Sequence, residues 1–414
     1  MVSTVKRIPR PWKILGGLGG LAAIMACVLL FSSHSPVSSV RAAALQAAVP
    51  DVLPVEITNN SGRGEQVHIY VVGTNLETGR LGYVNESGAF TPWPAGSIPP
   101  TPAPDVSIGG PANGASKTIR IPRGMSGRVY FSFGEKISFF LTPDGLVQPA
   151  PWNPSDPNHN VILDWSEFTL NNDGLWLNSS QVDMFSIPHS VAVTNEQGAT
   201  KKTGELVSNG RNRIFDAVQA QAGDWAGLVT TRSDGLRLRV LSPAKGIDAG
   251  VFNSAYLDGY ISSAWDAYRS KTLTVVPFQH EPDKRFTGRT DADGVMRFTD
   301  GSGATVASFE KPSTKDVFGC DGRLHAPNDQ VVGPIARTLC AALHRSTLGR
   351  LDTQPTYDAA EFYKQEVTNH YSRIIHENMV DGRAYGFPFD DVGGFESLVH
   401  DGAPASAAIT LTAW

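Results

Sequence analysis

The sequence predicts an α+β protein in which a β-rich part comes first and a part that mixes helices with strands follows. At 414 residues the chain exceeds what one hydrophobic core usually supports, so two parts of roughly 150–200 residues are expected. The 41 glycines and 28 prolines favour many turns, and 41% apolar residues are enough for buried cores. Near residue 210 short alternating runs give way to three- and four-residue spacing, which indicates that helices begin there.

The first 44 residues have the composition of a secretory signal peptide. Four basic residues precede an apolar run at 14–31, and Ala42, Ala43 and Ala44 are small residues of the kind that a signal peptidase recognises. We therefore expect a secreted, extracellular protein without membrane association after cleavage of residues 1–44. The run of about 18 residues is also just long enough to span a bilayer, so an uncleaved anchor is an alternative.

The charge of the remaining chain argues against a nucleic-acid partner. Without residues 1–44 there are 30 basic and 40 acidic side chains, a formal net charge of -10. A phosphate backbone is bound by clustered Lys and Arg, and no basic run is present after the signal segment.

Residues 45–208, together with 383–414, are predicted to form a β-sandwich or barrel. Short apolar runs separated by Gly, Pro and Asn are typical of such folds. The tail at 409–414 alternates again, so we expect it to return to the first sheet. The predicted strands are 54–58, 66–72, 117–121, 127–133, 137–141 and 161–169.

Residues 209–382 are predicted to form a domain of mixed helices and strands. Ile214, Phe215 and Val218 fit one face of a short helix, and a hairpin pattern covers 285–309. Further helices are expected at 256–268, 334–348 and 360–379, and further strands at 236–241 and 273–278.

Cys320 and Cys340 are the cysteines that export would leave, because Cys27 lies in the signal segment. An even pair about 20 residues apart in an oxidising compartment most simply forms one disulfide, worth roughly 3 kcal/mol. A metal site on Cys320, His325 and Cys340 is the alternative, and it has too few ligands. We therefore expect a disulfide and no metal.

Two carboxylates in the stretch 160–188 are the strongest catalytic candidates. Trp165, Glu167 and Thr169 share one face of a predicted strand, and Asp183 follows in a second polar and aromatic run. Glycoside hydrolysis needs one protonated carboxyl group and one ionised carboxylate, and Glu167 and Asp183 are the natural pair. An isolated acidic residue on a strand is more often a solvated charge, so the spacing alone leaves both interpretations open.

The expected hairpin sets a condition on how these carboxylates meet. A tight turn at Asn172, Asp173 and Gly174 pairs Glu167 with about residue 179, so that Asp183 would lie roughly 13 Å further along. We expect either a wide loop that resets the register or a curved sheet. A separation of about 6.5–9.5 Å leaves room for a water and predicts inversion, whereas about 5–5.5 Å predicts retention.

The same stretch resembles the catalytic segment of glycoside hydrolase family 64. The resemblance rests on residues 164–169, on Asn178 and on 181–185, and it extends to 57–61, 311–320 and 385–394. It implies a thaumatin-like β-barrel domain beside a mixed α/β domain, with a wide groove for a β-1,3-glucan chain. The implied activity is hydrolysis with inversion, with a pentaose as the expected product.

The resemblance also implies roles for individual residues. Glu167 would be the general acid and Asp183 the general base. Thr169, Asn171, Trp176 and Ser180 match sugar-contacting positions, with Ser180 in place of the usual Thr. Acid–base cleavage needs no metal or organic cofactor, and we expect a monomer.

Residue chemistry adds three expectations. Burial against Trp165, or a nearby carboxylate, should raise the pKa of Glu167. Gln181, Asn178 or Ser180 should donate hydrogen bonds to Asp183. The candidates for stacking on glucose are Trp152, Trp165, Trp176, Phe387 and Phe389, each of which could instead belong to a core.

Two other classes of protein remain alternatives. A thaumatin-like β-1,3-glucan-binding protein would use the same groove without turnover. A structural protein of the cell envelope would keep residues 1–44 as an anchor.

Overall fold

The computed structural model describes residues 49–414. The predicted signal peptide at 1–44 and Cys27 therefore lie outside the described residues. Between residues 49 and 414 there is no helix of the length and apolar character needed to cross a membrane.

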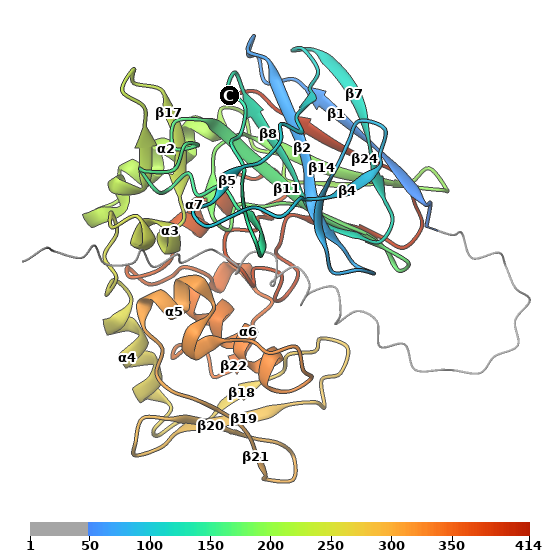
Figure 1. The fold of residues 1–414 in the computed structure, drawn as a ribbon. Helices are drawn as coiled ribbons and strands as arrows, with labels where there is room; N and C mark the ends of the chain where they lie inside the picture. Colours follow the sequence, from blue (N-terminus) through green and yellow to red (C-terminus); the bar gives the residue numbers. More distant parts are fainter. Residues whose placement is uncertain (1–48) are drawn as a thin grey trace, which may run out of the picture.

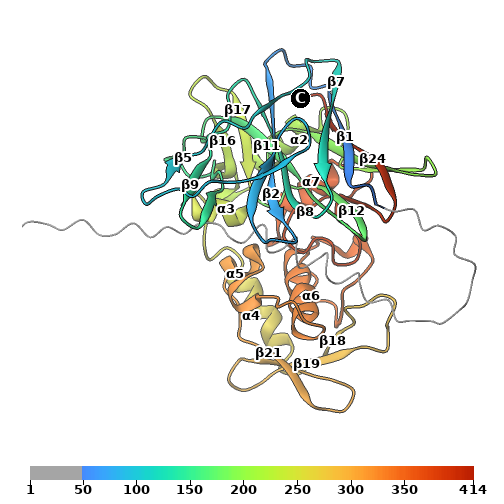
Figure 2. The same ribbon diagram turned by 45° about the vertical axis from the view of Figure 1, so that its right-hand side comes forward.

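Two β-sheets packed face to face form the larger part of the molecule, as Figures 1 and 2 show. The five-stranded sheet has the order β15 (Thr200–Thr203), β14 (His189–Asn195), β24 (Pro404–Leu411), β1 (Val52–Asn59) and β7 (Ala115–Pro122). The larger sheet has the order β23 (Leu398–Asp401), β12 (Gly174–Ser179), β11 (Ile162–Asn171), β8 (Met125–Phe133), β2 (Val67–Asn75), β3 (Leu81–Val84) and β4 (Phe90–Pro92), with β6 (Ile108–Gly109) also paired to β2.

Alternation along the strands directs one set of side chains into the space between the two sheets. Ile57 and Ile409 from the five-stranded sheet meet Val129, Phe168 and Leu177 from the larger sheet in one buried cluster. The opposite face of the larger sheet therefore carries the residues at the alternate positions, which include Glu167. The predicted β-rich class of this part is confirmed.

The C-terminal strand is central to the five-stranded sheet. β24 lies between β14 and β1, with Ile409 paired in parallel with Ile57. The predicted return of the tail to the first sheet is thereby confirmed. The strands predicted at 54–58, 66–72, 117–121, 127–133 and 161–169 are also confirmed, whereas the one predicted at 137–141 begins only at Phe140.

A second five-stranded sheet and several helices form the other end of the molecule (Figures 1 and 2). The sheet has the order β21 (Thr305–Phe309), β20 (Met296–Thr299), β19 (Phe286–Thr290), β18 (Leu273–Val275) and β22 (Thr353–Gln354). The helices at this end are α4 (Asp258–Ala267), α5 (Thr314–Gly319) and α6 (Val332–His344). The helices α2 (Gly210–Gln219), α3 (Pro243–Asp248) and α7 (His370–Glu377) lie beside the sandwich, and 3-10 turns occur at Gly223–Leu228, Gly322–Leu324 and Ala359–Glu361.

Two small sheets lie at the end of the molecule that holds the packed sheets (Figures 1 and 2). β13 (Met184–Phe185) pairs with β17 (Arg237–Leu241), which also pairs with β16 (Val229–Thr231). Another small sheet has the order β10 (Gly145–Val147), β9 (Phe140–Thr142) and β5 (Thr101–Pro102). One apolar cluster runs from Trp165 of the larger sheet to Leu339 of α6, so the two ends share a continuous core.

The helix predicted at 360–379 is wrong in its extent. Tyr363 has a left-handed backbone with a φ of 55°, which interrupts a right-handed helix. Asn369 then starts α7, because its side chain accepts a hydrogen bond from the backbone N–H of Ser372. The apolar stripe of Tyr371, Ile374 and Ile375 is real, and it belongs to a helix of eight residues.

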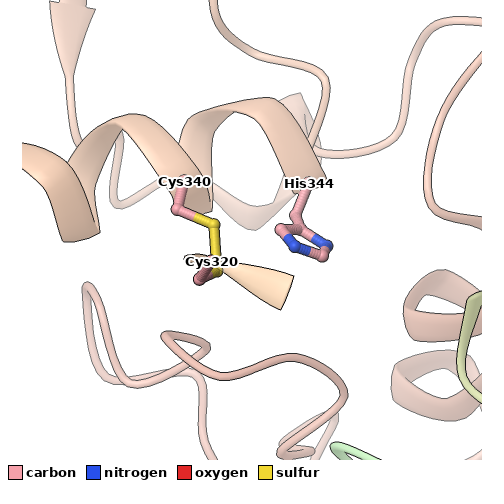
Figure 3. Close-up of side chains that lie close together, drawn as sticks. All are labelled: Cys320, Cys340 and His344. Carbon is pink, nitrogen blue, oxygen red and sulfur yellow. A yellow bond between two sulfur atoms is a disulfide. The ribbon is translucent and has the colours of Figure 1, made fainter. Parts of the chain in front are cut away.

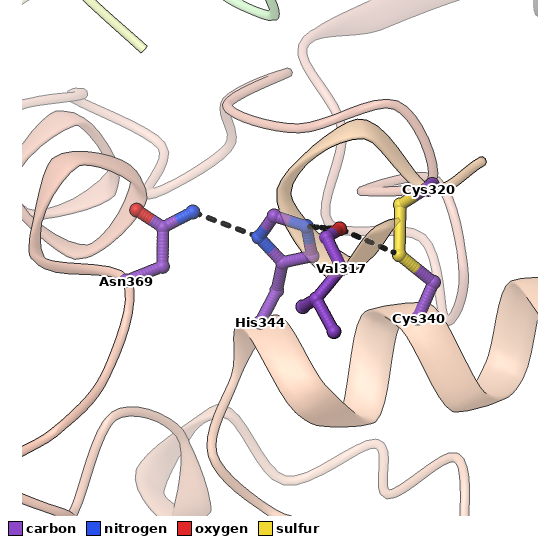
Figure 4. Close-up of a disulfide and its surroundings, with 5 residues drawn as sticks. All are labelled: Val317, Cys320, Cys340, His344 and Asn369. Atoms are coloured by element: carbon purple, nitrogen blue, oxygen red, sulfur yellow. Dashed lines mark hydrogen bonds between the residues drawn. A yellow bond between two sulfur atoms is a disulfide. The ribbon is translucent and has the colours of Figure 1, made fainter. Parts of the chain in front are cut away.

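The predicted disulfide between Cys320 and Cys340 is confirmed, and it ties α5 to α6. His344 lies beside it, as Figure 3 shows. Its Nε2 lies 2.8 Å from the carbonyl oxygen of Val317 and its Nδ1 lies 2.8 Å from the amide nitrogen of Asn369 (Figure 4). The first nitrogen therefore donates and the second accepts, which describes a neutral ring, and burial lowers the pKa of His344 to about 4.

This cluster does not suit a metal ion. Each sulfur is already bonded to the other, and the Sγ of Cys340 lies 3.3 Å from Val317 O without a proton to donate. Both nitrogens of His344 are engaged as well. Among residues 49–414, Cys320, Cys340 and His344 are the only such trio of side chains close enough to share an ion. His325, the third ligand of the metal alternative, is not part of it.

Candidate active site

The hairpin of β11 and β12 places Glu167 on the open face of the larger sheet. Glu167 is paired with Asn178, and Thr169 with Trp176. Only two residues connect the strands, and Gly174 at the start of β12 has a φ of 129°. A Cβ atom at this position would lie 2.2 Å from the carbonyl oxygen of Asp401, so glycine permits both the turn and the approach of β23. The predicted register is confirmed to within one residue.

Asp183 comes close to Glu167 by a route that the sequence analysis did not foresee. The hairpin is a simple one, so neither the predicted wide loop nor a reset register is present. Instead, β12 ends at Ser179, and Ser180 forms an isolated bridge with Tyr385. The next residues leave the ladder, with the carbonyl oxygen of Gln181 accepting a hydrogen bond of 2.6 Å from the Tyr371 hydroxyl. The backbone therefore turns away from the direction of β12 before it reaches Asp183.

Arg128 connects the two carboxylates. It lies directly opposite Glu167 on β8, and its Nε donates to Oε1 of Glu167 over 3.1 Å. Its Nη2 lies 3.9 Å from Oδ2 of Asp183. Because both nitrogens belong to one guanidinium, the two carboxylate oxygens are held within about 9.5 Å, the upper limit for inverting glycosidases.

Asp183 also has a second cation beside it. Nζ of Lys245 in α3 lies 3.3 Å from Oδ1 of Asp183 and 4.5 Å from the centre of the Trp152 ring. The donors predicted for Asp183 are therefore wrong. Among residues 49–414 its carboxylate contacts Lys245 and Arg128, and none of the three predicted side chains. Gln181 instead donates to Ser179 Oγ and accepts from the backbone N–H of Tyr385.

The surroundings of Glu167 favour its protonated form. The residue is only 6% exposed, and burial raises the pKa of Glu167. Arg128 opposes this shift and Asp183 adds to it. The predicted direction of the pKa shift is thereby confirmed, and a positive charge that was not predicted moderates it.

Trp165 lies beside Glu167 on the same face of β11 and packs against Arg128. The ring is 2% exposed, with the guanidinium of Arg128 4.6 Å from its centre and the Tyr130 ring at 5.4 Å. It has almost no surface to offer to a sugar. Arg128 also donates to the Tyr130 hydroxyl, which in turn donates to Gln148 over 2.7 Å. The aromatic ring and this hydrogen-bond chain fix the guanidinium in place.

The other predicted sugar-contacting residues extend along the hairpin from Glu167. The Thr169 hydroxyl is 2.8 Å from that of Ser126, and Asn171 ends β11 with its side chain accepting from the backbone N–H of Asp173. Trp176 is 6% exposed and stacks on His400 at 4.2 Å. Ser180 is buried where β12 ends. The structure thus brings Thr169 and Trp176 to the face that carries Glu167, whereas Asn171 lies at the far end of the hairpin.

Two of the aromatic candidates belong to the core. Phe387 is 1% exposed and stacks on His344, and Phe389 is 5% exposed, within the same apolar cluster. Trp152 is partly exposed and stands beside Lys245. Of the described aromatic candidates, Trp152 is therefore the one with open surface next to the carboxylates.

Sequence reasoning missed Arg128 and Lys245. A signal for Arg128 was present, because Arg128 and Tyr130 alternate along the strand predicted at 127–133, which is otherwise apolar or small. What the sequence did not reveal is that this strand pairs with the one that carries Glu167. Lys245 gave no local signal, since its contact with Asp183 depends on the packing of α3.

Comparisons with known proteins show the family of this chain. The family model described as Beta-1,3-glucanase, that of glycoside hydrolase family 64, matches residues 51–411. Glucan endo-1,3-beta-glucosidases of Arthrobacter sp. (strain YCWD3) and Cellulosimicrobium cellulans are each 49% identical over 392 residues, which is 94% of this chain and 70% of each relative. The crystal structure of a laminaripentaose-producing beta-1,3-glucanase in complex with laminaritetraose is 55% identical, with a TM-score of 0.85 over 88% of this chain and 99% of that one. The mostly β architecture with some helices is shared with that structure, and the chain belongs to glycoside hydrolase family 64, the β-1,3-glucanase family.

Proposed function

We propose that this protein is a β-1,3-glucanase that cleaves glucans of the laminarin and curdlan type with inversion at the anomeric carbon. The observation that carries the proposal is the pair of carboxylates on one guanidinium, with Glu167 buried and Asp183 beside a second cation. Relatives named glucan endo-1,3-beta-glucosidase and a structural neighbour with laminaritetraose support the substrate class.

In this mechanism the two carboxyl groups have opposite starting states. Protonated Glu167 donates its proton to the glycosidic oxygen as the bond to the anomeric carbon breaks. Asp183 accepts a proton from water, whose oxygen attacks the same carbon from the opposite face. The product carries the inverted configuration, and the two carboxyl groups return to their starting states after proton exchange with solvent.

Arg128 adjusts the pKa of Glu167 for its role as the general acid. Burial disfavours the carboxylate, which keeps the proton available, while the guanidinium stabilises the carboxylate that forms once the proton has left. An acid is most effective when its pKa lies near the working pH, and these two opposing influences bring Glu167 toward that range. No metal or organic cofactor is needed for this chemistry.

The substrate would lie along the hairpin face. We propose that Thr169, Asn171, Trp176 and Ser180 contact the sugar, with Ser180 offering a hydroxyl without the methyl group of the usual Thr. Trp165 acts through Arg128, because its ring is covered. A wide groove between a thaumatin-like domain (45–208 with 383–414) and a mixed domain (209–382) would hold the chain, and a laminaripentaose product is expected. The protein is further proposed to be a secreted monomer.

A timed digest of laminarin, with the anomer of the first product followed by NMR, tests the proposal. The expected result is soluble oligosaccharide, pentaose prominent, that appears first as the α-anomer. Binding of laminarin without any release of sugar would favour the alternative of a non-catalytic glucan-binding protein. A product that appears first as the β-anomer would leave a glucanase and overturn inversion.

A further inference from the structure

The carboxylate of Asp183 lies between two cations at unequal distances. Nζ of Lys245 is 3.3 Å from Oδ1, whereas Nη2 of Arg128 is 3.9 Å from Oδ2. The Arg128 contact is longer than a hydrogen bond, and that guanidinium makes its hydrogen bond to Glu167 instead. Lys245 is therefore the nearer charge partner of Asp183.

Several contacts fix Lys245 in this place. Met184 pairs with Leu241, and the backbone N–H of Ser242 donates to the carbonyl oxygen of Asp183 over 3.0 Å. Ser242 then caps α3, with its side chain accepting from the backbone N–H of Lys245. The backbone of Asp183 and the start of α3 are thus joined, and the Trp152 ring lies 4.5 Å from the ammonium group.

We propose that Lys245 is a positioning residue that keeps the Asp183 carboxylate apart from the Glu167–Arg128 pair. This inference rests on the proposed function. Without the ammonium group, Arg128 would be the remaining cation beside Asp183, and the carboxylate would move toward it and therefore toward Glu167. Inverting cleavage needs room for a water molecule between base and sugar, and that room is lost as the carboxylates approach about 5–5.5 Å.

The nature of the Lys245 contacts supports a positioning role. An ammonium group has three N–H donors, and its nearest partners are Asp183 and the Trp152 ring, with the charge of Asp321 also acting on it. A carboxylate has about four acceptor positions, so the two cations leave lone pairs on Asp183 for a water molecule. The lysine thereby orients the base without blocking it.

The test compares Lys245→Met, which keeps an unbranched side chain as far as Cε and removes the charge, with Lys245→Arg, which keeps the charge. For Lys245→Met we expect kcat on laminarin to fall about 100-fold with KM changed less than threefold, because a displacement of about 1 Å has an effect of that size. Lys245→Arg should recover at least tenfold of this loss. The matched control is Lys271→Met, which removes an exposed lysine paired with Asp352, away from α3, and should leave both constants unchanged.

The outcomes separate this inference from the proposed function. A wild-type protein that releases no sugar overturns both. If the wild type cleaves laminarin and Lys245→Met keeps kcat within twofold, or Lys245→Arg is no better than Lys245→Met, the positioning role alone is overturned. Circular dichroism checks folding, and Lys245→Gln replaces a Met variant that does not fold. Failure of both neutral variants to fold would show a structural role and also overturn the proposal.

Discussion

Arg128 and Glu167 face each other across the neighbouring strands β8 and β11, and Nε of Arg128 donates to Oε1 of Glu167 over 3.1 Å. The pair is almost fully buried, with 9% and 8% of the two side chains exposed. Burial and a positive charge therefore act on the same carboxyl group in opposite directions.

Replacing Arg128 should shift the pH dependence of activity. A general acid loses activity as pH rises through its pKa, and Arg128 lowers the pKa of Glu167. In Arg128→Met the basic limb of the kcat/KM profile should move to higher pH, and the free energy of unfolding at pH 8 should fall by about 3 kcal/mol, because a buried charge loses its partner. Arg128→Lys, which keeps the charge, is the control. An unmoved basic limb in the Met variant would contradict this role.

Removing either carboxylate should abolish most of the activity without loss of the fold. Glu167→Gln and Asp183→Asn should each lower kcat by about 10²–10⁴-fold, because each removes one proton transfer. Laminarin binding, measured by calorimetry, should stay within threefold of the wild type. Asp173→Asn, in the exposed turn of the same hairpin, should leave kcat unchanged. Full activity in either of the first two variants would show that another group performs the step.

Asp164, on the opposite face of β11 from Glu167, should be important for stability. Its Oδ2 accepts from the backbone N–H groups of Ser186 and Ile187, both at 2.9 Å, and it thereby fixes the segment that follows Asp183. Asp164→Ala should lower the free energy of unfolding by about 3 kcal/mol, because buried N–H groups lose their acceptor. Urea denaturation measures this, with Asp144→Ala at an exposed turn as the control. Equal midpoints for the two variants would refute the role.

His376 should make stability depend on pH. Its Nδ1 faces the carbonyl oxygen of Gly382 at 2.8 Å and its Nε2 faces Oδ2 of Asp390 at 2.9 Å, so both contacts are satisfied only by the protonated ring. Burial alone would lower the pKa of His376, but Asp390 and the Gly382 carbonyl raise it overall. A raised pKa gives stability that is complete below about pH 6.5 and is lost as pH rises through the folded-state value. Thermal unfolding of the wild type and His376→Gln should therefore differ most at low pH, and a difference that grows with pH would contradict this.

The disulfide should stabilise the fold without affecting kcat. Cys320 and Cys340 are 20 residues apart, and replacing both with Ala should lower the free energy of unfolding by about 3 kcal/mol. The pair makes no described contact with Glu167, Asp183, Arg128 or Lys245, so kcat of the folded variant should match the wild type at 25 °C. A large loss of kcat in a folded double variant would show that α5 and α6 act on the site.

Local patterns predicted much of the fold because they depend on neighbouring residues. The alternation in β11 and the turn at Asn172 and Asp173 were enough to place Glu167 opposite Asn178 to within one residue. The prediction of one helix over 360–379 was wrong because it also rested on a local pattern. That pattern included the apolar stripe of α7 but gave no sign of the left-handed backbone of Tyr363. Propensity does not reveal a single residue whose conformation is set by tertiary contacts.

The sequence predicted the two carboxylates of the site but neither the path that brings them together nor the two cations beside them. Glu167 and Asp183 stood out through their residue types, but the sequence distance between them suggested that a simple hairpin would hold them too far apart. The structure resolves this through the bridge from Ser180 to Tyr385, a contact between residues 205 positions apart. Arg128 and Lys245 come from other elements again, and no pattern along the chain indicates which strands and helices become neighbours.

The position of β24 has a consequence for how the molecule assembles. Because Pro404–Leu411 separates β1 from β14, the earliest and the last strands must meet before the first sheet is complete. A contact of such long range is slow to form, since residues 60–403 between the two strands close as one loop. The sandwich therefore cannot be finished until Leu411 has been synthesised, and its N-terminal strands depend until then on other means of avoiding aggregation.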